Sequence, residues 1–165
     1  MSLFLPDLIK KNITEITAGE LREKGIGGLL LDVDNTLAIH GSQEPFEGVD
    51  RWLSDMRVAG IKLMILSNAR KKRVAPFAKT ISLPFRSFSV KPFPWSYLRA
   101  CRKIGLRRRE TAIVGDQIIT DTIGGNLCGI YTVLVMPPRE ETSFTGKLKR
   151  GFEKWLLKRN DLYWE

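Results

Sequence analysis

Two carboxylates at the end of an apolar run constrain the fold of this chain more than any other feature. Three consecutive leucines, 29–31, lead directly into Asp32, and Asp34 follows two residues later. An apolar run that stops at acidic residues predicts a buried strand of a parallel sheet, about 28–34, with the acids at its carboxyl end. Val33 points to the opposite face, so the two carboxylates share one side. Because adjacent carboxylates repel, such a pair holds a cation or divides its acids between two roles.

A second element of the same kind comes later in the chain. The apolar stretch 112–114 runs into Gly115 and Asp116, and Asp121 lies just beyond. Open α/β sheets bind their ligands at the carboxyl edge of the strands. Together the two elements predict a metal-dependent phosphate site at that edge.

Helical and strand patterns alternate along the rest of the chain. A capping box at Thr17 opens a short helix that Gly25 ends, and Pro76 is expected to kink or shorten a later helix. Alternation of this kind predicts an α/β fold in three layers, a doubly wound parallel sheet in one domain, 1–165. The expected strands are 28–34, 61–66, 85–90, 111–114 and 131–136, and the expected helices after the first are 52–60, 70–80, 95–104 and 118–127.

Both ends of the chain show helical apolar spacing. An N-terminal helical segment is expected within 1–25, and a basic amphipathic helix at 143–160. The C-terminal helix has two interpretations: it packs its apolar stripe on the domain, which we favour, or it lies in the interface of an anionic membrane. The apolar residues concerned are Leu5, Leu8, Ile9, Ile13 and Ile16 in the first segment, and Leu148, Phe152, Trp155 and Leu156 in the second.

The charge balance restricts the partners. Lys and Arg number 27 against 18 acidic residues, a net charge of +9 over 165 residues. Such a surface favours nucleic acid, anionic lipid or a phosphorylated substrate. No apolar stretch approaches the roughly 20 residues of a membrane span, and the start does not resemble a secretory signal. We therefore expect a cytoplasmic protein, with peripheral membrane contact left open, in which Cys101 and Cys128 are buried thiols.

Four short motifs, separated along the chain, occur in an order that indicates a known superfamily. They resemble the haloacid dehalogenase (HAD) superfamily of phosphohydrolases, and their finer wording resembles its YqeG-type group in subfamily IIIA, which includes mitochondrial-type phosphatidylglycerophosphate phosphatases. The likeness covers roughly 7–158, and Asn35, where many members have Gly, is interpreted as a trait of the subgroup. The motifs are Asp32-x-Asp34-x-Thr36, Ser67-Asn68, Lys91-Pro92 and Gly115-Asp116-x-x-x-x-Asp121.

The resemblance implies catalytic roles. Asp32 would be the nucleophile that forms an aspartyl-phosphate, and Asp34 would be the general acid and then the general base. Lys91 would neutralise charge on the transferring group. Thr36 and Ser67 would donate hydrogen bonds to phosphate oxygens, with the backbone around Asn68 helping.

The resemblance also implies a Mg²⁺ site. Asp116 would bind the ion together with the Asp32 carboxylate and the main-chain carbonyl of Asp34. Asp121 would orient Lys91 or the waters on the metal. His40, the only histidine, is given no role, and Phe93 and Trp95 after Lys91 are expected in the core rather than at a substrate mouth.

The spacing between the motifs leaves no room for an inserted cap domain. One loop, one helix and one strand fill 34–67, and a helix with a short strand fills 67–91. An open site suits a large or interface-bound substrate that supplies its own cover. A phospholipid headgroup on an anionic membrane also fits the basic surface and the amphipathic ends.

The leading hypothesis is a Mg²⁺-dependent phosphomonoesterase that uses an aspartyl-phosphate intermediate, with phosphatidylglycerophosphate as its substrate in phospholipid synthesis. One alternative is a phosphatase of nucleic acid ends or of phosphoproteins, which are also large and anionic. A second alternative is a basic binding module that keeps the fold without chemistry. The sequence makes no prediction of the oligomeric state.

Overall fold

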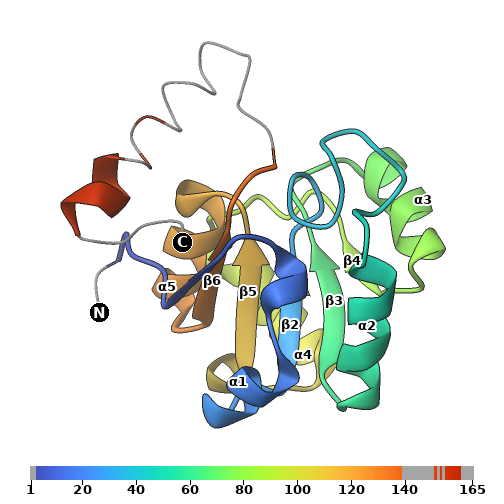
Figure 1. Ribbon diagram of the computed structural model, residues 1–165, viewed down its shortest axis with the longest axis horizontal. Coiled ribbons are helices and arrows are strands. Elements are labelled where there is room, and N and C mark those ends of the chain that lie inside the picture. Colours follow the sequence, from blue (N-terminus) through green and yellow to red (C-terminus); the bar gives the residue numbers. More distant parts are fainter. Residues whose placement is uncertain (1–2, 139–150, 152, 154, 161–165) are drawn as a thin grey trace.

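Six parallel strands form the centre of the computed structural model, which describes residues 3–138, 151, 153 and 155–160. The strands are β1 (Leu8–Lys10), β2 (Gly28–Leu31), β3 (Lys62–Leu66), β4 (Phe85–Arg86), β5 (Thr111–Gly115) and β6 (Tyr131–Val135). They lie in the order β1-β6-β5-β2-β3-β4, and every neighbouring pair is parallel. Figure 1 shows the arrowheads at the upper edge of the sheet, where the loops that follow β2 also lie.

Helices cover both faces of this sheet. They are α1 (Ala18–Glu23), α2 (Val49–Val58), α3 (Lys71–Thr80), α4 (Pro94–Ile104) and α5 (Ile123–Cys128), with 3₁₀ turns η1 (Ile13–Glu15) and η2 (Arg108–Glu110) and a π-helix η3 (Ile118–Thr122). Buried side chains of η1, α2 and α3 form the larger core on one face. Buried side chains of α4 and α5 form a smaller core on the other. The three-layer, doubly wound sheet is confirmed.

The apolar run before Asp32 is continuous because β2 is covered on both faces. Leu29 and Leu31 point into the larger core, whereas Leu30 points into the smaller one. A strand that is buried on both sides needs an apolar residue at every position, not at alternate ones. The same reasoning explains the apolar run at 112–114 in β5, all of whose residues are buried.

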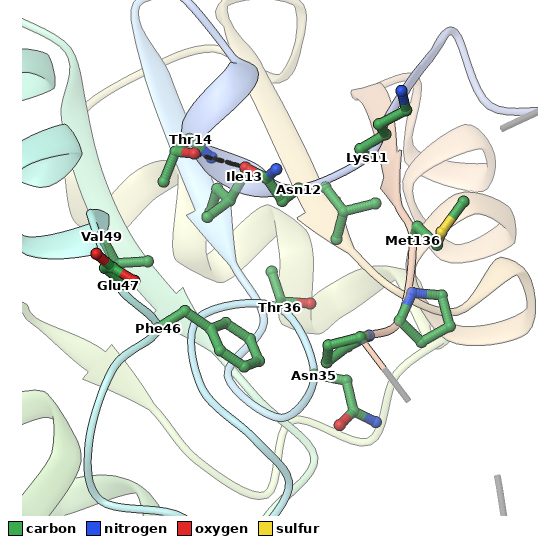
Figure 2. A pocket seen from close by; sticks show the side chains of 13 residues that line it. Lys11, Asn12, Ile13, Thr14, Asn35, Thr36, Phe46, Glu47, Val49 and Met136 are labelled. Carbon is green, nitrogen blue, oxygen red and sulfur yellow. Dashed lines mark hydrogen bonds between the residues drawn. The ribbon is translucent and has the colours of Figure 1, made fainter. Parts of the chain in front are cut away.

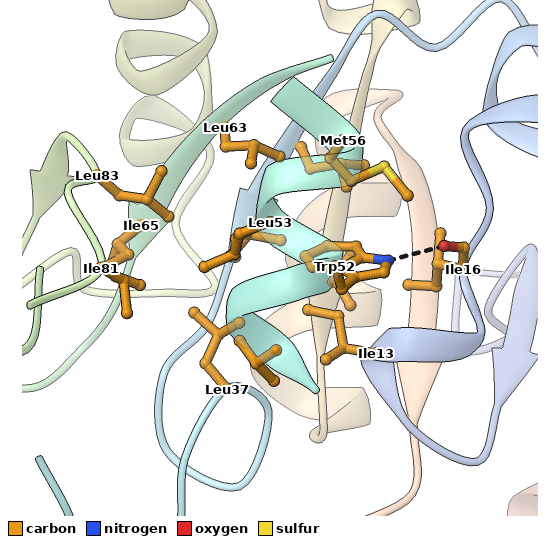
Figure 3. Close-up of a cluster of buried hydrophobic side chains, with 14 of the residues drawn as sticks. Ile13, Ile16, Leu37, Trp52, Leu53, Met56, Leu63, Ile65, Ile81 and Leu83 are labelled. Atoms are coloured by element: carbon orange, nitrogen blue, oxygen red, sulfur yellow. Dashed lines mark hydrogen bonds between the residues drawn. The ribbon is translucent and has the colours of Figure 1, made fainter. Parts of the chain in front are cut away.

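Trp52 joins the N-terminal segment to the larger core (Figure 3). Its indole ring is buried beside Leu53 and Met56 of α2, and its Nε1–H donates a hydrogen bond of 2.8 Å to the carbonyl oxygen of Ile16. A buried indole N–H needs such a partner. The contact fixes the chain between η1 and α1 against α2.

The order of the strands creates a position for a ligand at the carboxyl edge of the sheet, beside β2. From β2 the chain moves outward through β3 to β4 and then returns to β5 on the other side of β2. Where the winding reverses in this way, the two connections diverge and open a ligand position. Asp32 follows β2 and Asp116 follows β5, so both lie at this position.

The prediction of a helix through the first apolar stripe, from Leu5 to Ile16, is wrong. Leu8–Lys10 forms the edge strand β1 against β6, and only Ile13–Glu15 makes a single 3₁₀ turn. Leu8 packs against the larger core and Ile9 against a third cluster with Ile118, so the two neighbours point to opposite faces. Their adjacency therefore belongs to a strand with both sides covered, and the strand also pairs the open edge of β6.

Other expected elements hold with shifted bounds. The Thr17 capping box opens α1 and is confirmed, and Gly25 follows the helix with a φ of 70°. Pro76 lies inside α3, which continues without interruption over Lys71–Thr80. The strand expected at 85–90 is only two residues long, and the helix expected at 118–127 begins as a π-helix. Cys101 and Cys128 are buried free thiols.

The C-terminal helix is described only in part. Leu148 and Phe152, which carry half of its expected apolar stripe, lie outside the described residues. Leu156 and Leu157 pack against Ile118, whereas Trp155 is about half exposed and carries the guanidinium of Arg159 over its ring at 5.4 Å. Among the described residues, no helix is long and apolar enough to cross a membrane.

Close packing between α5 and the sheet makes Gly125 sensitive to substitution. A Cβ atom there would lie 2.5 Å from Thr132 Cγ2 and 2.6 Å from Ile113 Cγ2. We expect Gly125→Ala to lower the free energy of unfolding by about 1–3 kcal/mol because buried side chains must shift. Gly19→Ala in α1 is the control, since a Cβ atom there would lie 3.9 Å from Thr17 Oγ1, an ordinary contact distance. Urea unfolding followed by circular dichroism measures both, and equal midpoints would contradict the prediction.

Candidate active site

A buried lysine links two carboxylates at the carboxyl edge of the sheet. Lys91 Nζ donates hydrogen bonds to Asp32 Oδ1 at 2.8 Å and to Asp121 Oδ1 at 2.6 Å. Burial alone would lower the pKa of Lys91, but the charges of Asp121 and Asp32 raise it above its usual value. Lys91 is therefore a fixed positive charge inside the protein.

Three carboxylates surround this charge. Oxygens of Asp32, Asp116 and Asp121 lie within 4.8 Å of one another, and all three residues are buried. Burial, opposed by the charge of Lys91 and assisted by the charges of Asp121 and Asp116, raises the pKa of Asp32 to about 7. With the three acids ionised, one ammonium leaves two negative charges uncompensated. An all-oxygen cluster with this charge fits a hard divalent cation such as Mg²⁺.

Backbone geometry places Asp116 and Asp121. Asp116 follows β5 directly and is fully buried. A Cβ atom at Gly115 would collide with the carboxyl group of Asp121, so only glycine lets this acid approach the strand end. The second oxygen of Asp121 accepts hydrogen bonds of 3.3 Å from the Gln117 amide and the Thr120 hydroxyl. These contacts leave Oδ1 directed at Lys91.

The Asn68 side chain holds the loop that delivers Lys91. Its Oδ1 accepts a hydrogen bond of 2.6 Å from the Lys91 amide, and its Nδ2 donates one of 3.1 Å to the Lys91 carbonyl. The Ser89 amide also donates to the Ser67 carbonyl at 3.0 Å. The loop after β4 is thereby bound to the loop after β3. The structure thus gives the Asn68 side chain a role that the sequence did not predict.

Asp34 lies outside the carboxylate cluster and has its own cation. Arg73 Nη2 donates to Asp34 Oδ1 at 2.8 Å, and the Gly41 amide donates to the same oxygen at 3.1 Å. His40 Nδ1 lies 3.7 Å from Asp34 Oδ2, although its ring is largely exposed. The sequence predicts no role at the site for Arg73 or for His40. The only signal for Arg73 is its spacing of four residues from buried Phe77, over whose ring its guanidinium lies at 5.6 Å.

Asn35 and Thr36 border a pocket of about 420 Å³ beside the cluster (Figure 2). Thr36 is buried, and its hydroxyl has no hydrogen-bond partner in the described structure. A buried hydroxyl without a partner is costly and is available for a ligand oxygen. Asn35 has a φ of 62°, which asparagine tolerates better than most residues, and its Nδ2 lies 3.5 Å from Asp116 Oδ2. The left-handed backbone at position 35 therefore suits asparagine as well as glycine.

The structure brings the residues of all four motifs to one edge of the sheet. Asp32, Lys91, Asp116 and Asp121 are in direct contact or within the same cluster. Ser67 is buried beside the Lys91 loop, and its hydroxyl accepts a hydrogen bond of 3.2 Å from the Ala69 amide. The catalytic and binding roles of these residues remain predictions.

Two findings near the site differ from the sequence expectations or were not expected. Phe93 and Trp95 are exposed rather than in the core. Glu153, in the partly described C-terminal helix, is buried, and its Oε1 accepts a hydrogen bond of 2.9 Å from the Ile118 amide. The C-terminal segment therefore contacts the π-helix that carries Asp121. The sequence does not predict the contact between Glu153 and Ile118, because the segment around Glu153 is otherwise basic and amphipathic.

Comparison with known proteins gives consistent results. Residues 3–129 match the haloacid dehalogenase-like hydrolase family. The chain is 33% identical to "Probable phosphatase YqeG" of Bacillus subtilis (strain 168) over 98% of this chain and 96% of that protein.

Solved structures share the fold at low sequence identity. An uncharacterized protein from Listeria monocytogenes serotype 4b matches with a TM-score of 0.57 and 16% identity, covering 72% of this chain and 85% of its own. A haloacid dehalogenase-like family hydrolase from Brucella suis 1330 matches with a TM-score of 0.54 and 10% identity, covering 80% and 95%.

The uncompensated charge of the carboxylate cluster predicts stabilisation by a cation. We expect Mg²⁺ to raise the melting temperature of protein stripped with EDTA, by the equivalent of about 2.7 kcal/mol at 100 times the dissociation constant. Asp116→Asn removes one ligand and should largely abolish the shift. Asp55→Asn, an exposed acid on α2, is the control and should keep it. Differential scanning fluorimetry measures all three, and a full shift in Asp116→Asn would contradict the assignment.

Proposed function

Since the chain belongs to the haloacid dehalogenase-like hydrolases and is a phosphatase of that family, we propose that it cleaves phosphomonoesters with Mg²⁺ through an aspartyl-phosphate. The observation that carries the proposal is the Lys91 ammonium held between Asp32 and Asp121. A phosphoryl group bound at Asp32 would lie close to the fixed positive charge of Lys91. Positioning and charge neutralisation are the main sources of catalysis in phosphoryl transfer.

In the first half of the proposed reaction, a carboxylate oxygen of Asp32 attacks phosphorus and the ester P–O bond breaks. Protonated Asp34 gives its proton to the departing alcohol oxygen, which leaves as a neutral alcohol. The product on the enzyme is a mixed anhydride of Asp32 with phosphate. Lys91 keeps the carboxyl group of Asp32 oriented throughout, because it binds the Oδ1 atom at 2.8 Å.

In the second half, water attacks the phosphorus of the aspartyl-phosphate. Asp34, now ionised, takes the proton from this water, and the P–O bond to Asp32 breaks. Inorganic phosphate leaves, and both acids return to their starting states. The Arg73 and Gly41 contacts to one oxygen of Asp34 hold this carboxyl group in place, which a group that moves a proton twice requires.

The donors around the cluster suit a phosphoryl group and a metal. Thr36 offers a buried hydroxyl without a partner, and Ser67 offers a second buried hydroxyl in the loop that is bonded to the Lys91 loop. Asp116, Asp32 and the Asp34 carbonyl would hold Mg²⁺, which would polarise the phosphoryl oxygens and favour the ionised form of Asp32. Asp121 would orient Lys91, in agreement with their hydrogen bond.

The surroundings of the site favour a large substrate. Within the described residues, the connections from β2 to β4 contain only a loop, α2 and α3, so no cap domain is inserted there. We propose phosphatidylglycerophosphate as the substrate, presented at the surface of an anionic membrane to a peripheral, cytoplasmic enzyme. An open site would be covered by the surface that presents such a lipid.

Phosphate release tests the reaction and the substrate together. We expect release from phosphatidylglycerophosphate in mixed micelles with Mg²⁺, its loss with EDTA, and its loss in Asp32→Asn. Asp55→Asn is the control for an acid-to-amide change outside the site. Removal of a covalent nucleophile should lower turnover by at least about 10³-fold.

The outcomes separate the alternatives. Release from an aryl phosphate or from oligonucleotide ends, but not from the lipid, would keep the phosphatase and overturn the lipid substrate. Unchanged turnover in Asp32→Asn would overturn the nucleophile. No release from any phosphomonoester would favour a basic binding module that keeps the fold.

The Arg73 contact predicts a dependence on the leaving group. Arg73→Gln should weaken the hold on Asp34 and lower turnover by about 10–100-fold for an alkyl phosphate, which needs a proton on its leaving oxygen. The loss should be much smaller for a nitrophenyl phosphate, whose leaving group needs none. Lys79→Gln, exposed on the same helix, is the control. Equal losses on both substrates would show that Arg73 acts in another way.

A further inference from the structure

Large apolar side chains are exposed mainly around the active site. Of the eleven such side chains among the described residues, six lie in the loops or the first helical turns that follow the carboxyl ends of strands, where the carboxylate cluster is. One follows β2, four follow β4 and one follows β5. We call these six residues the rim: Ile39, Phe88, Val90, Phe93, Trp95 and Ile119.

The rim borders the catalytic lysine directly. Phe88 and Val90 precede Lys91, and Phe93 and Trp95 follow it. The Phe88 amide donates a hydrogen bond of 2.8 Å to the carbonyl of Ala69, which places Phe88 beside the loop after β3. The rings of Phe93 and Trp95 stack at a centroid distance of 5.2 Å and an angle of 5°. The aromatic side chains thus form an ordered surface next to the site.

Two rim residues have a backbone conformation that their side chains disfavour. Phe88 has a φ of 48° and Val90 has a φ of 53°. Left-handed geometry is unusual for bulky residues and a true outlier for a β-branched one. Phe88 is nevertheless 70% exposed, so burial in the core does not offset the cost. An observed outlier without a packing reason supports a functional reason.

Basic side chains stand beside the rim. Arg70, Lys71 and Lys72 are all exposed at the start of α3, directly after the loop that contacts Phe88. The exposed acids in the loop before α2 are Glu44 and Glu47. The three adjacent cations, on a chain of net charge +9, favour an anionic occupant for the neighbouring apolar surface.

We propose that the rim, together with Arg70, Lys71 and Lys72, is a docking surface for an anionic lipid bilayer. Aromatic and aliphatic side chains enter the boundary between headgroups and acyl chains, and basic side chains bind the headgroup phosphates. Trp95 suits this depth because its ring is amphipathic. The proposal deepens the proposed function and rests on it, since docking in this orientation directs the open site at the bilayer surface.

Vesicle binding tests the docking surface without any catalytic step. The full chain is mixed with vesicles of phosphatidylcholine and phosphatidylglycerol, or of phosphatidylcholine alone, and bound protein is measured by sedimentation. We expect binding to the mixed vesicles that weakens with salt, and little binding to the neutral ones.

Two double variants probe the two parts of the surface. Phe88→Asn with Trp95→Ser should reduce binding to the mixed vesicles by about ten-fold or more through lost apolar contact. Lys71→Glu with Lys72→Glu should reduce it by about 25-fold, since each basic residue contributes about five-fold. Val58→Ser is the control for the first, because Val58 is 87% exposed at the end of α2, away from the rim. Arg108→Glu with Arg109→Glu is the control for the second, because η2 precedes β5 at the opposite edge.

Stability distinguishes lost docking from misfolding. Asparagine tolerates the left-handed backbone better than phenylalanine, so Phe88→Asn should leave the melting temperature unchanged or higher while binding falls. A variant that merely fails to fold would lose both. Glutamate at the start of a helix is favourable, so the charge variant should also fold.

Each outcome supports or overturns the proposal. Equal binding by the rim variant and Val58→Ser would overturn it, and so would a wild-type chain that binds neither kind of vesicle. A wild-type dimer that the rim variant converts to a monomer, without vesicle binding, would make the rim an interface between two copies of the chain. Vesicle binding without phosphate release from any phosphomonoester would retain the docking surface and overturn the proposed function instead.

Discussion

Lys91 is buried between Asp32 and Asp121, and the arrangement around the site depends on keeping these three groups together. Separating a buried ion pair by removing one partner typically costs about 3–5 kcal/mol, because the remaining charge has no water to solvate it. The loop of Lys91 is held accordingly by both polar atoms of the Asn68 side chain. The glycine at 115 and the amide of Gln117 serve the same end for Asp121. Much of the local sequence therefore keeps charges at contact distance.

The sequence predicted the centre of the fold well because its strongest signals are local. Apolar runs that end in acids located β2 and β5, and parallel strands bring their carboxyl ends to one edge. The contacts of Arg73 and Glu153 could not be predicted, because their partners, Asp34 and the Ile118 amide, are distant in sequence. β1 was predicted as a helix because Leu8 and Ile9 fit a helical stripe as well as a strand covered on both faces. Only tertiary pairing with β6 decides between these two.

The open site and the exposed aromatic side chains beside it have the same structural cause. The described connections between β2 and β4 form no cap, so the groups that flank Lys91 face outward. The aromatic residues on that loop are exposed for the same reason, although Phe93 and Trp95 were expected in the core from the sequence. A site of this shape acquires a dry environment only when something else closes over it. Its chemistry and its surroundings therefore have to be considered as one surface.

The two-sided burial of β2 has a consequence for how the sheet selects its alignment. A strand that alternates apolar and polar residues resists a slip of one position, because the slip exposes its apolar face. β2 has leucines toward both cores, so a slip past β5 would not by itself expose an apolar face. Asp32 does not tolerate it, because a shift toward the interior would carry a carboxylate away from Lys91 and into leucine-lined space. The carboxylate of Asp32 at the strand end thus also helps to set the register of β2.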